Sequence, residues 1–368
     1  MNEDLHIKLT QAIHDIYNSK FDQAEEKFTE MKSIYPKHPL PYFLMGLSNW
    51  WKMMPYKEGD ERIEPYAKVF IKEMETSIEK ADEMYERNQN NLEAVFFLTS
   101  AHSMLARYYA ENNKNKLKIV NHARIALQNL KKIIDHENEL DIEFLFGTAL
   151  FNYYGEWFRD EYPWLKPLMV FFPKGDKKKG LEQLTEVSNN AFWTRAEAQY
   201  FLMKIYFIEE DDDAKAYPIA KYLYETFPDN PYFHRLYTRL SYTLGKKQEA
   251  KKLAEELLYR VNIGMPGYEE ISGRYASFIV GRQYYLNKDY EKAKQHYKMT
   301  LVFGEKSEAQ DQNYYLQAAT DLATMADNEK DIPTARSYYK LVEKYAPKKN
   351  PLYKQAKEYL KRTKNAER

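Results

Sequence analysis

Small side chains recur along this chain at a fixed interval, and this recurrence constrains the fold more than any other feature of the sequence. The triplet Ala216, Ala220 and Leu223 returns 34 residues later as Ala-Ala-Leu at positions 250, 254 and 257. A period of that length is typical of proteins built from repeated pairs of helices. Because each pair can bury its hydrophobic face only against the next pair, such repeats must stack.

The same template is found in other parts of the chain. In residues 274–305, Gly281 takes the small position of a first helix, and tyrosines flank Ala293 in the second helix. Gly46 and Gly147 stand at matching places in earlier segments. Two helices that pack ridge into groove at short range leave no room for a large side chain where they cross. We therefore predict that these glycines mark helix crossings.

The composition agrees with an all-helical chain, since only 12 glycines and 15 prolines occur in 368 residues. We predict an all-α fold, a right-handed α-solenoid of eight or nine helix pairs. A long helix is expected from Glu64 to about Glu86, and a helix pair over residues 92–134. The predicted organisation is a single solenoid over residues 1–368, with N-terminal repeats (5–140), an irregular helix pair with an aromatic insert (141–187), regular repeats (188–350) and a closing helix (351–368).

The segment 141–187 departs most from the repeat, because about 20 residues rich in aromatic rings, including the insert 157–173, separate two helices there. We expect the next helix to begin near Asp176, which would cap its N-terminus. The rings either form a small core beneath the loop or make a hydrophobic surface that contacts a membrane or a membrane protein. The residues concerned are Trp157, Trp164, Phe171 and Phe172.

The sequence offers little sign of catalysis. It has no cysteine, and its eight histidines lack the spacing of a metal site. We therefore predict no catalytic residues, no cofactor and no metal. The 55 basic and 55 acidic residues cancel, which argues against a nucleic-acid partner. The acidic start of the chain predicts a cytoplasmic protein, or a periplasmic one if a signal peptide has been removed.

The inner surface of the helix stack is the place where we expect a partner to bind. Residues on either side of each small position should face this groove, and they are aromatic or arginine side chains, which interfaces favour. Such residues suit a partner with acidic and apolar side chains, although rings of this kind also fill the core between repeats. The predicted groove residues are Phe43, Leu47, Trp50, Trp51, Tyr232, Arg235, Arg239, Tyr242, Tyr275, Phe278, Arg282 and Tyr285.

The spacing of small residues, tyrosines and prolines resembles the tetratricopeptide repeat family over residues 5–51 and 196–347. This resemblance implies a non-enzymatic scaffold that binds a protein or peptide partner in its concave groove. The alternative is an envelope-associated assembly protein that uses the insert 157–173. A third interpretation is an enzyme with its site in a cavity beneath the same insert.

Overall fold

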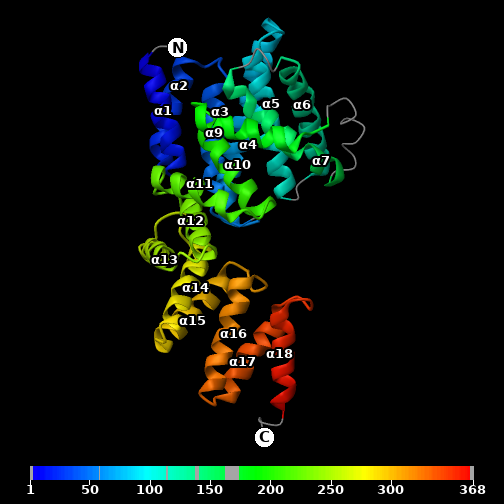
Figure 1. The fold of residues 1–368 in the computed structure, drawn as a ribbon. Coiled ribbons are helices and arrows are strands. Elements are labelled where there is room, and N and C mark those ends of the chain that lie inside the picture. The colour runs from blue at the N-terminus through cyan, green and yellow to red at the C-terminus, as the bar shows by residue number, and fades with distance from the viewer. Residues whose placement is uncertain (1–2, 58, 113–114, 137–140, 162–173, 365–368) are drawn as a thin grey trace. The chain divides into compact units, whose positions relative to one another are not determined.

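A computed structural model describes residues 3–57, 59–112, 115–136, 141–161 and 174–364, and within these residues the secondary structure is helical throughout (Figure 1). By contacts between Cα atoms the chain divides into two compact units, the N-terminal unit (Met1–Asn230) and the C-terminal unit (Pro231–Arg368). Each unit is described separately below.

The N-terminal unit consists of five helix pairs and three short helical turns, as far as the structure describes it. The pairs are α1 (Glu3–Tyr17) with α2 (Phe21–Ile34), α3 (Leu40–Met53) with α4 (Glu64–Arg87), α5 (Leu92–Glu111) with α6 (Lys116–Ile134), α7 (Leu145–Glu161) with α9 (Lys177–Asn190), and α10 (Arg195–Lys204) with α11 (Asp213–Thr226). The turns are η1 (Glu61–Ile63) and η3 (Ile142–Phe144), both 3₁₀, and η5 (Ile205–Glu209), which is π-helical.

The described part of the C-terminal unit contains three helix pairs and a closing helix. The pairs are α12 (Pro231–Thr243) with α13 (Lys247–Asn262), α14 (Glu270–Leu286) with α15 (Tyr290–Lys306), and α16 (Asn313–Asn328) with α17 (Ile332–Tyr345). The last helix, α18 (Pro351–Arg362), packs against α17. The predicted all-α fold of tetratricopeptide-like helix pairs is confirmed by these elements.

Two of the predicted helix crossings are found where the glycines indicate. A Cβ atom at Gly281 would lie 2.9 Å from the ring of Tyr297, and one at Gly46 would lie 2.7 Å from Met74. Both contacts join the first helix of a pair to the second, α14 to α15 and α3 to α4. Both distances are below those that real Cβ atoms adopt. A larger residue at Gly281 would therefore displace the Tyr297 ring, whereas at Gly46 the flexible end of the Met74 side chain would have to move aside.

The third expected crossing, at Gly147 in α7, is wrong. A Cβ atom there would meet only Leu130, at an ordinary 3.6 Å. The close approach of α7 to α9 occurs instead at Gly180, where a Cβ atom would lie 2.6 Å from the backbone nitrogen of Tyr153. The small residue that the crossing requires is therefore on the second helix of this pair.

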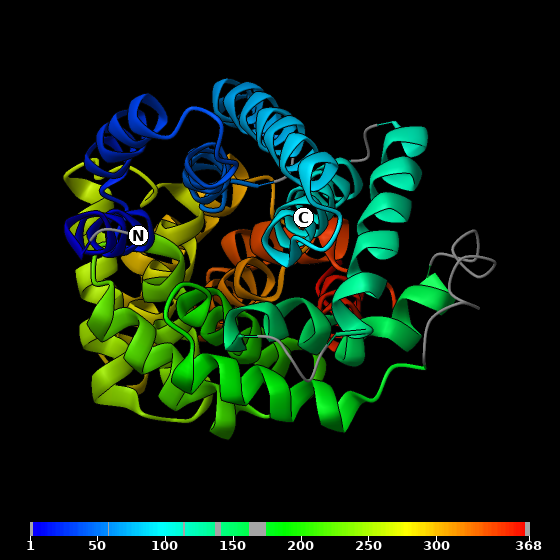
Figure 2. The same ribbon diagram turned by 90° about the horizontal axis from the view of Figure 1, so that it is seen from above.

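The first and last helix pairs of the N-terminal unit are in contact, so the pairs follow one another around a ring (Figure 2). The hydroxyl of Tyr17 in α1 donates a hydrogen bond of 3.0 Å to Glu197 in α10. Asn230, just beyond α11, donates to the backbone carbonyl of Tyr17 at 2.8 Å. These contacts join residues 180 and 213 positions apart in the sequence. They would not form in a linear stack, in which each pair contacts only its neighbours.

Candidate functional site

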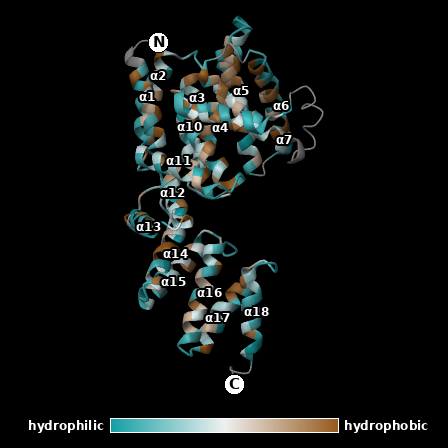
Figure 3. Ribbon diagram, in the orientation of Figure 1, coloured by the Kyte–Doolittle hydropathy of each residue, from teal (hydrophilic) through white to brown (hydrophobic). Residues whose placement is uncertain are grey.

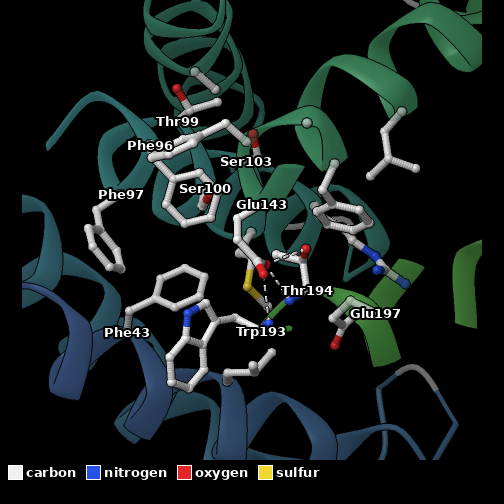
Figure 4. A pocket seen from close by; sticks show the side chains of 18 of the residues that line it. Phe43, Phe96, Phe97, Thr99, Ser100, Ser103, Glu143, Trp193, Thr194 and Glu197 are labelled. Atoms are coloured by element: carbon white, nitrogen blue, oxygen red, sulfur yellow. Dashed lines mark hydrogen bonds between the residues drawn. The ribbon is translucent and has the colours of Figure 1, made fainter. Parts of the chain in front are cut away.

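A large cavity lies on the inner side of the N-terminal unit, with a volume of about 1110 Å³ (Figure 4). It is lined mainly by the first helices of successive pairs, α1, α3, α5, α7 and α10, together with α6. We call it the aromatic cavity, because thirteen aromatic side chains lie in its wall: Tyr17, Tyr35, Phe43, Trp50, Phe96, Phe97, Phe144, Phe146, Phe151, Tyr154, Trp157, Trp193 and Phe201.

Helices α3 and α5 supply much of the apolar wall, and both carry more hydrophobic residues than the closing helix α18 (Figure 3). A helix that is hydrophobic around most of its circumference must be covered on several faces. One side of α3 packs on α4, and residues on another side, among them Phe43 and Trp50, line the cavity. The cavity wall therefore consists of apolar side chains that the packing of helices within each pair leaves uncovered.

Glu143 fixes the entry of the chain into α10. Its carboxylate accepts hydrogen bonds from the backbone N–H groups of Phe192, Trp193 and Thr194, at 2.5, 3.0 and 2.8 Å. The hydroxyl of Thr194 donates a further bond of 2.8 Å. A carboxylate at a helix N-terminus satisfies donors that the helix itself cannot. These bonds place the Trp193 ring and the Glu143 carboxylate at the cavity wall (Figure 4).

Glu197 joins three helices at the cavity wall. One carboxylate oxygen, Oε1, accepts bonds from the indole N–H of Trp51 in α3 at 2.8 Å and from the hydroxyl of Tyr17 in α1 at 3.0 Å. Burial raises the pKa of the Glu197 carboxyl, while the two hydrogen bonds and the charge of Arg107 oppose that change. We call this contact the Glu197 clasp, because it connects α1 and α3 to α10.

Arg107 in α5 is the main cationic group of the cavity. Its guanidinium lies over the rings of Trp50 and Phe201, 4.7 and 5.6 Å from their centres, and its Nε donates to Glu111 at 2.7 Å. Contacts of this kind hold a cation between aromatic faces. Lys204 also lines the cavity, and burial together with the charge of Arg107 lowers its pKa.

The π-helical turn η5 follows Lys204 directly, and it carries Glu209 to the cavity wall. Turns with this wide hydrogen-bond pattern are rare and occur often at functional sites. Burial and the negative charge of Glu209 raise the pKa of Tyr154 on α7. The end of α10 therefore brings several ionisable groups together at one side of an otherwise apolar space.

The predicted groove residues of the second helix pair fall partly in this cavity. Phe43, Leu47 and Trp50 line it. The Trp51 ring is only 2% exposed, is absent from the described lining, and takes part in the Glu197 clasp instead.

Most of the aromatic insert lies outside the described residues, including Trp164, Phe171 and Phe172. Trp157 is described, and its side chain is 49% exposed and lines the aromatic cavity. The expected N-cap is confirmed, because Asp176 accepts a hydrogen bond of 3.0 Å from the backbone N–H of Lys179 in α9. A role of the insert in membrane contact stays a prediction. No described helix has both the length and the apolar content needed to cross a membrane.

In the C-terminal unit, the predicted groove arginines are engaged with their own unit. Arg235 is only 6% exposed and donates to the carbonyl of Gly267 at 3.3 Å and to the hydroxyl of Ser272 at 3.1 Å. Arg282 forms an ion pair with Asp321 at 3.5 Å. These guanidinium groups therefore connect the first helices of neighbouring pairs. The spacing of arginines in the sequence does not distinguish such a structural contact from a contact with a ligand.

The predicted rings of this unit gather around Tyr314, a residue that the sequence pattern does not single out. Its ring centre lies 4.8 Å from that of Phe278, 5.0 Å from that of Tyr275 and 6.3 Å from that of Tyr242. The guanidinium of Arg239 lies 4.8 Å from the centre of the Tyr275 ring. Tyr242 and Phe278 line a shallow hollow, whereas Tyr232 lies beside Arg235 and Tyr285 beside Tyr290.

Glu197, Arg107 and Glu143 carry no sequence pattern that predicts their place at the cavity wall. Each is a charged residue on a helix or at a helix start, and such residues usually face solvent. The adjacent pair Phe96 and Phe97 on α5 was a usable signal, because two neighbouring rings on one helix cannot both face the partner helix. For Glu197 no local signal exists, since its role depends on contacts with α1 and α3.

These features define an all-α helical-repeat protein with a large aromatic cavity. No protein-family model and no curated protein matches the chain. Among solved structures, the chain is similar to the crystal structure of yeast Tom70, with 11% identity and a TM-score of 0.37 over 100% of this chain and 90% of that one. It is also similar to the TPR domain of P58(IPK), with 13% identity and a TM-score of 0.26 over 98% and 99% of the two chains. The fold assignment rests on the helix pairs themselves.

Proposed function

We propose that this protein is a non-enzymatic scaffold that binds an apolar segment of a partner protein in the aromatic cavity. The observation that supports this proposal is the size of the cavity together with its aromatic wall. Small-molecule pockets usually have volumes of about 300–1,000 Å³, and this cavity lies above that range.

A helical segment is a suitable occupant by volume. A helix with side chains is roughly 10–12 Å across and rises about 5.4 Å per turn, so the cavity has room for about two turns. Aromatic side chains bury a large area at low entropic cost, and partner helices commonly insert apolar anchors into grooves of this kind. In the C-terminal unit, the rings around Tyr314 are a candidate second contact for the partner protein. They include the predicted groove residues Tyr242, Tyr275 and Phe278.

Site-specific photo-crosslinking tests the proposal. Ser103 on α5 is exposed and lines the cavity, so a photoreactive residue placed there would contact the occupant. We expect crosslinking in the native cell to give a protein adduct that maps to one segment of one partner. The matched control is Thr185 on α9, which is also exposed but does not line the cavity.

Filling the cavity supplies the complementary test. Gly147 lines the cavity, and a Cβ atom there would make only an ordinary contact with Leu130, so Gly147→Leu should add a side chain to the cavity wall. This variant should lose the adduct formed at position 103. An adduct that survives the filling, or one formed only with a lipid or metabolite, would contradict partner binding in the cavity.

A further inference from the structure

The charged residues of the aromatic cavity are unequal in sign. Among the described lining residues, Arg107 and Lys204 are the two cationic side chains, apart from His38. Six carboxylates line the same space: Glu93, Glu111, Asp141, Glu143, Glu197 and Glu209. The chain as a whole is neutral, with 55 basic and 55 acidic residues, so this excess of negative charge is local.

Neutral donors, rather than cations, hold several of these carboxylates. Glu143 is bonded by three backbone N–H groups and one hydroxyl, and Asp141 accepts from the backbone N–H of Glu143 at 3.2 Å. Glu197 accepts from an indole and a phenol. Bonds from neutral groups fix a carboxylate in position without cancelling its charge.

The cationic side chains compensate for only part of this charge. The Arg107 guanidinium is paired with Glu111 and covered by the rings of Trp50 and Phe201. At the start of the same helix, α5, Glu93 pairs with His38 at 3.3 Å. The cations among the described lining residues therefore balance only part of the negative charge at the cavity wall.

Aromatic rings share the cavity wall with the acidic groups. Figure 4 shows Phe43, Phe96 and Phe97 lining the same pocket as Glu143. The Phe97 ring centre lies 5.8 Å from that of Phe43 and 5.5 Å from that of Phe96. The face of an aromatic ring is electronegative, so rings together with carboxylates favour a cation that is attached to an apolar body.

We propose that the occupant of the aromatic cavity is an amphipathic helix of a partner protein that carries lysine or arginine beside its apolar face. This inference rests on the proposed function and specifies the chemistry of the partner. It differs from the acidic partner that the arginine-rich sequence pattern favours, because those arginines lie in the C-terminal unit and are engaged there.

Two matched peptides test the charge preference on the full-length chain. Both are labelled 18-residue helices with the same leucine face, and their polar faces consist of lysine in one peptide and glutamate in the other. We expect fluorescence anisotropy to show at least tenfold tighter binding of the lysine peptide, with affinity falling as salt is raised.

Variants then locate the binding. Glu93→Gln combined with Glu209→Gln removes two of the six cavity carboxylates, the one paired with His38 in the first turn of α5 and the one at the end of η5. This double variant should weaken binding of the lysine peptide about fivefold to tenfold. The control pair Glu182→Gln and Glu186→Gln on α9 lies outside the described cavity lining and should change nothing. The filling variant Gly147→Leu should abolish binding of the lysine peptide.

The outcomes separate the two proposals. Equal binding of both peptides, abolished by Gly147→Leu, would overturn the charge preference and leave partner binding in the cavity supported. Lysine-peptide binding that Gly147→Leu does not affect would overturn the cavity as the site, and with it the proposed function. Displacement of the lysine peptide by dodecanoate at micromolar concentration, with no effect of dodecylammonium, would assign the cavity to an anionic amphiphile and overturn the inference.

Discussion

At the scale of single residues, the Glu197 clasp is the contact that closes the N-terminal unit. Trp51 and Tyr17 are 2% and 1% exposed, and both donate to this carboxylate. Replacing Glu197 by alanine removes the acceptor of both buried hydrogen bonds, and we expect a loss of about 2–4 kcal/mol in the free energy of unfolding. Urea titration of the full chain measures this loss.

Glu197→Gln is the matched control. Both donors reach the same oxygen, Oε1, and an amide oxygen can accept both bonds while carrying no charge. Because burial already raises the pKa of this carboxyl, loss of the charge should cost less than about 0.5 kcal/mol. A glutamine variant as unstable as the alanine variant would show that the charge, rather than the hydrogen bonds, holds the clasp.

A contact between the buried His102 and the half-buried His122 makes stability depend on pH. The Nδ1 atoms of His102 and His122 lie 2.8 Å apart, and burial, with a smaller effect of His122, lowers the pKa of His102 to about 4. An unfolded histidine titrates near about 6.5, so the unfolded chain binds more protons between these values. Stability should therefore fall as pH drops from about 6.5 to about 4, by up to about 3 kcal/mol for this group.

Urea titrations across this pH range, repeated for His102→Gln, check the expectation. The buried His234 in α12 has a pKa lowered to about 3 by burial and adds a loss of the same sign. Both proteins should retain the pH dependence that comes from His234. The free energy of unfolding of the His102→Gln variant should depend less steeply on pH than that of the wild type. Identical slopes would contradict the assignment to His102.

At the scale of elements, the pairing of α7 with α9 depends on Gly180. Its Cβ position is blocked by two backbone atoms, the Tyr153 nitrogen at 2.6 Å and the Ala149 carbonyl oxygen at 2.8 Å. Because backbone atoms cannot move aside as flexible side chains do, Gly180→Ala should destabilise the N-terminal unit by about 1–3 kcal/mol. Gly147→Ala on the same pair should instead stabilise it by about 0.5–1 kcal/mol, through helix propensity alone. Thermal unfolding of the two variants gives the comparison, and equal effects would contradict it.

The elements themselves were predictable from sequence where a local pattern specifies them. The long helix expected from Glu64 is α4, which ends at Arg87, and the pair expected over residues 92–134 is α5 with α6. The residue at which the two helices of a pair cross was harder to predict, because either helix can supply the small residue. Gly147 fits the position expected on the first helix, whereas the close approach of the backbones occurs at Gly180 on the second helix.

The cavity is less predictable than the helices that line it. The period of a repeat describes how neighbouring pairs pack, whereas closure of the N-terminal unit depends on curvature added up over five pairs. Glu197 meets Tyr17 only because of that curvature. For the same reason the sequence placed Trp51 in a groove, although its indole N–H is used to close the ring.

At the scale of the whole molecule, the boundary at Asn230 has a measurable consequence. We expect a fragment of residues 1–230 to fold alone, since it contains every contact of the clasp. A fragment ending at Thr226 lacks Phe227, which packs on Tyr17, and Asn230, which donates to the Tyr17 carbonyl. Losing a buried phenylalanine costs about 3–5 kcal/mol, so the shorter fragment should melt about 10 °C lower. Circular dichroism melts of both fragments measure this, and equal melting temperatures would contradict the role of these residues.

Closure by residues about 180 positions apart also has a consequence for synthesis on the ribosome. The hydrophobic helices α3 and α5 leave the exit tunnel long before α10 and Asn230, which complete the ring. Until then, nascent chains expose aromatic surface that aggregates readily, and folding must wait for distant contacts. Translation stalled before residue 230 should therefore yield chains that remain bound to chaperones, whereas chains released after this point should not.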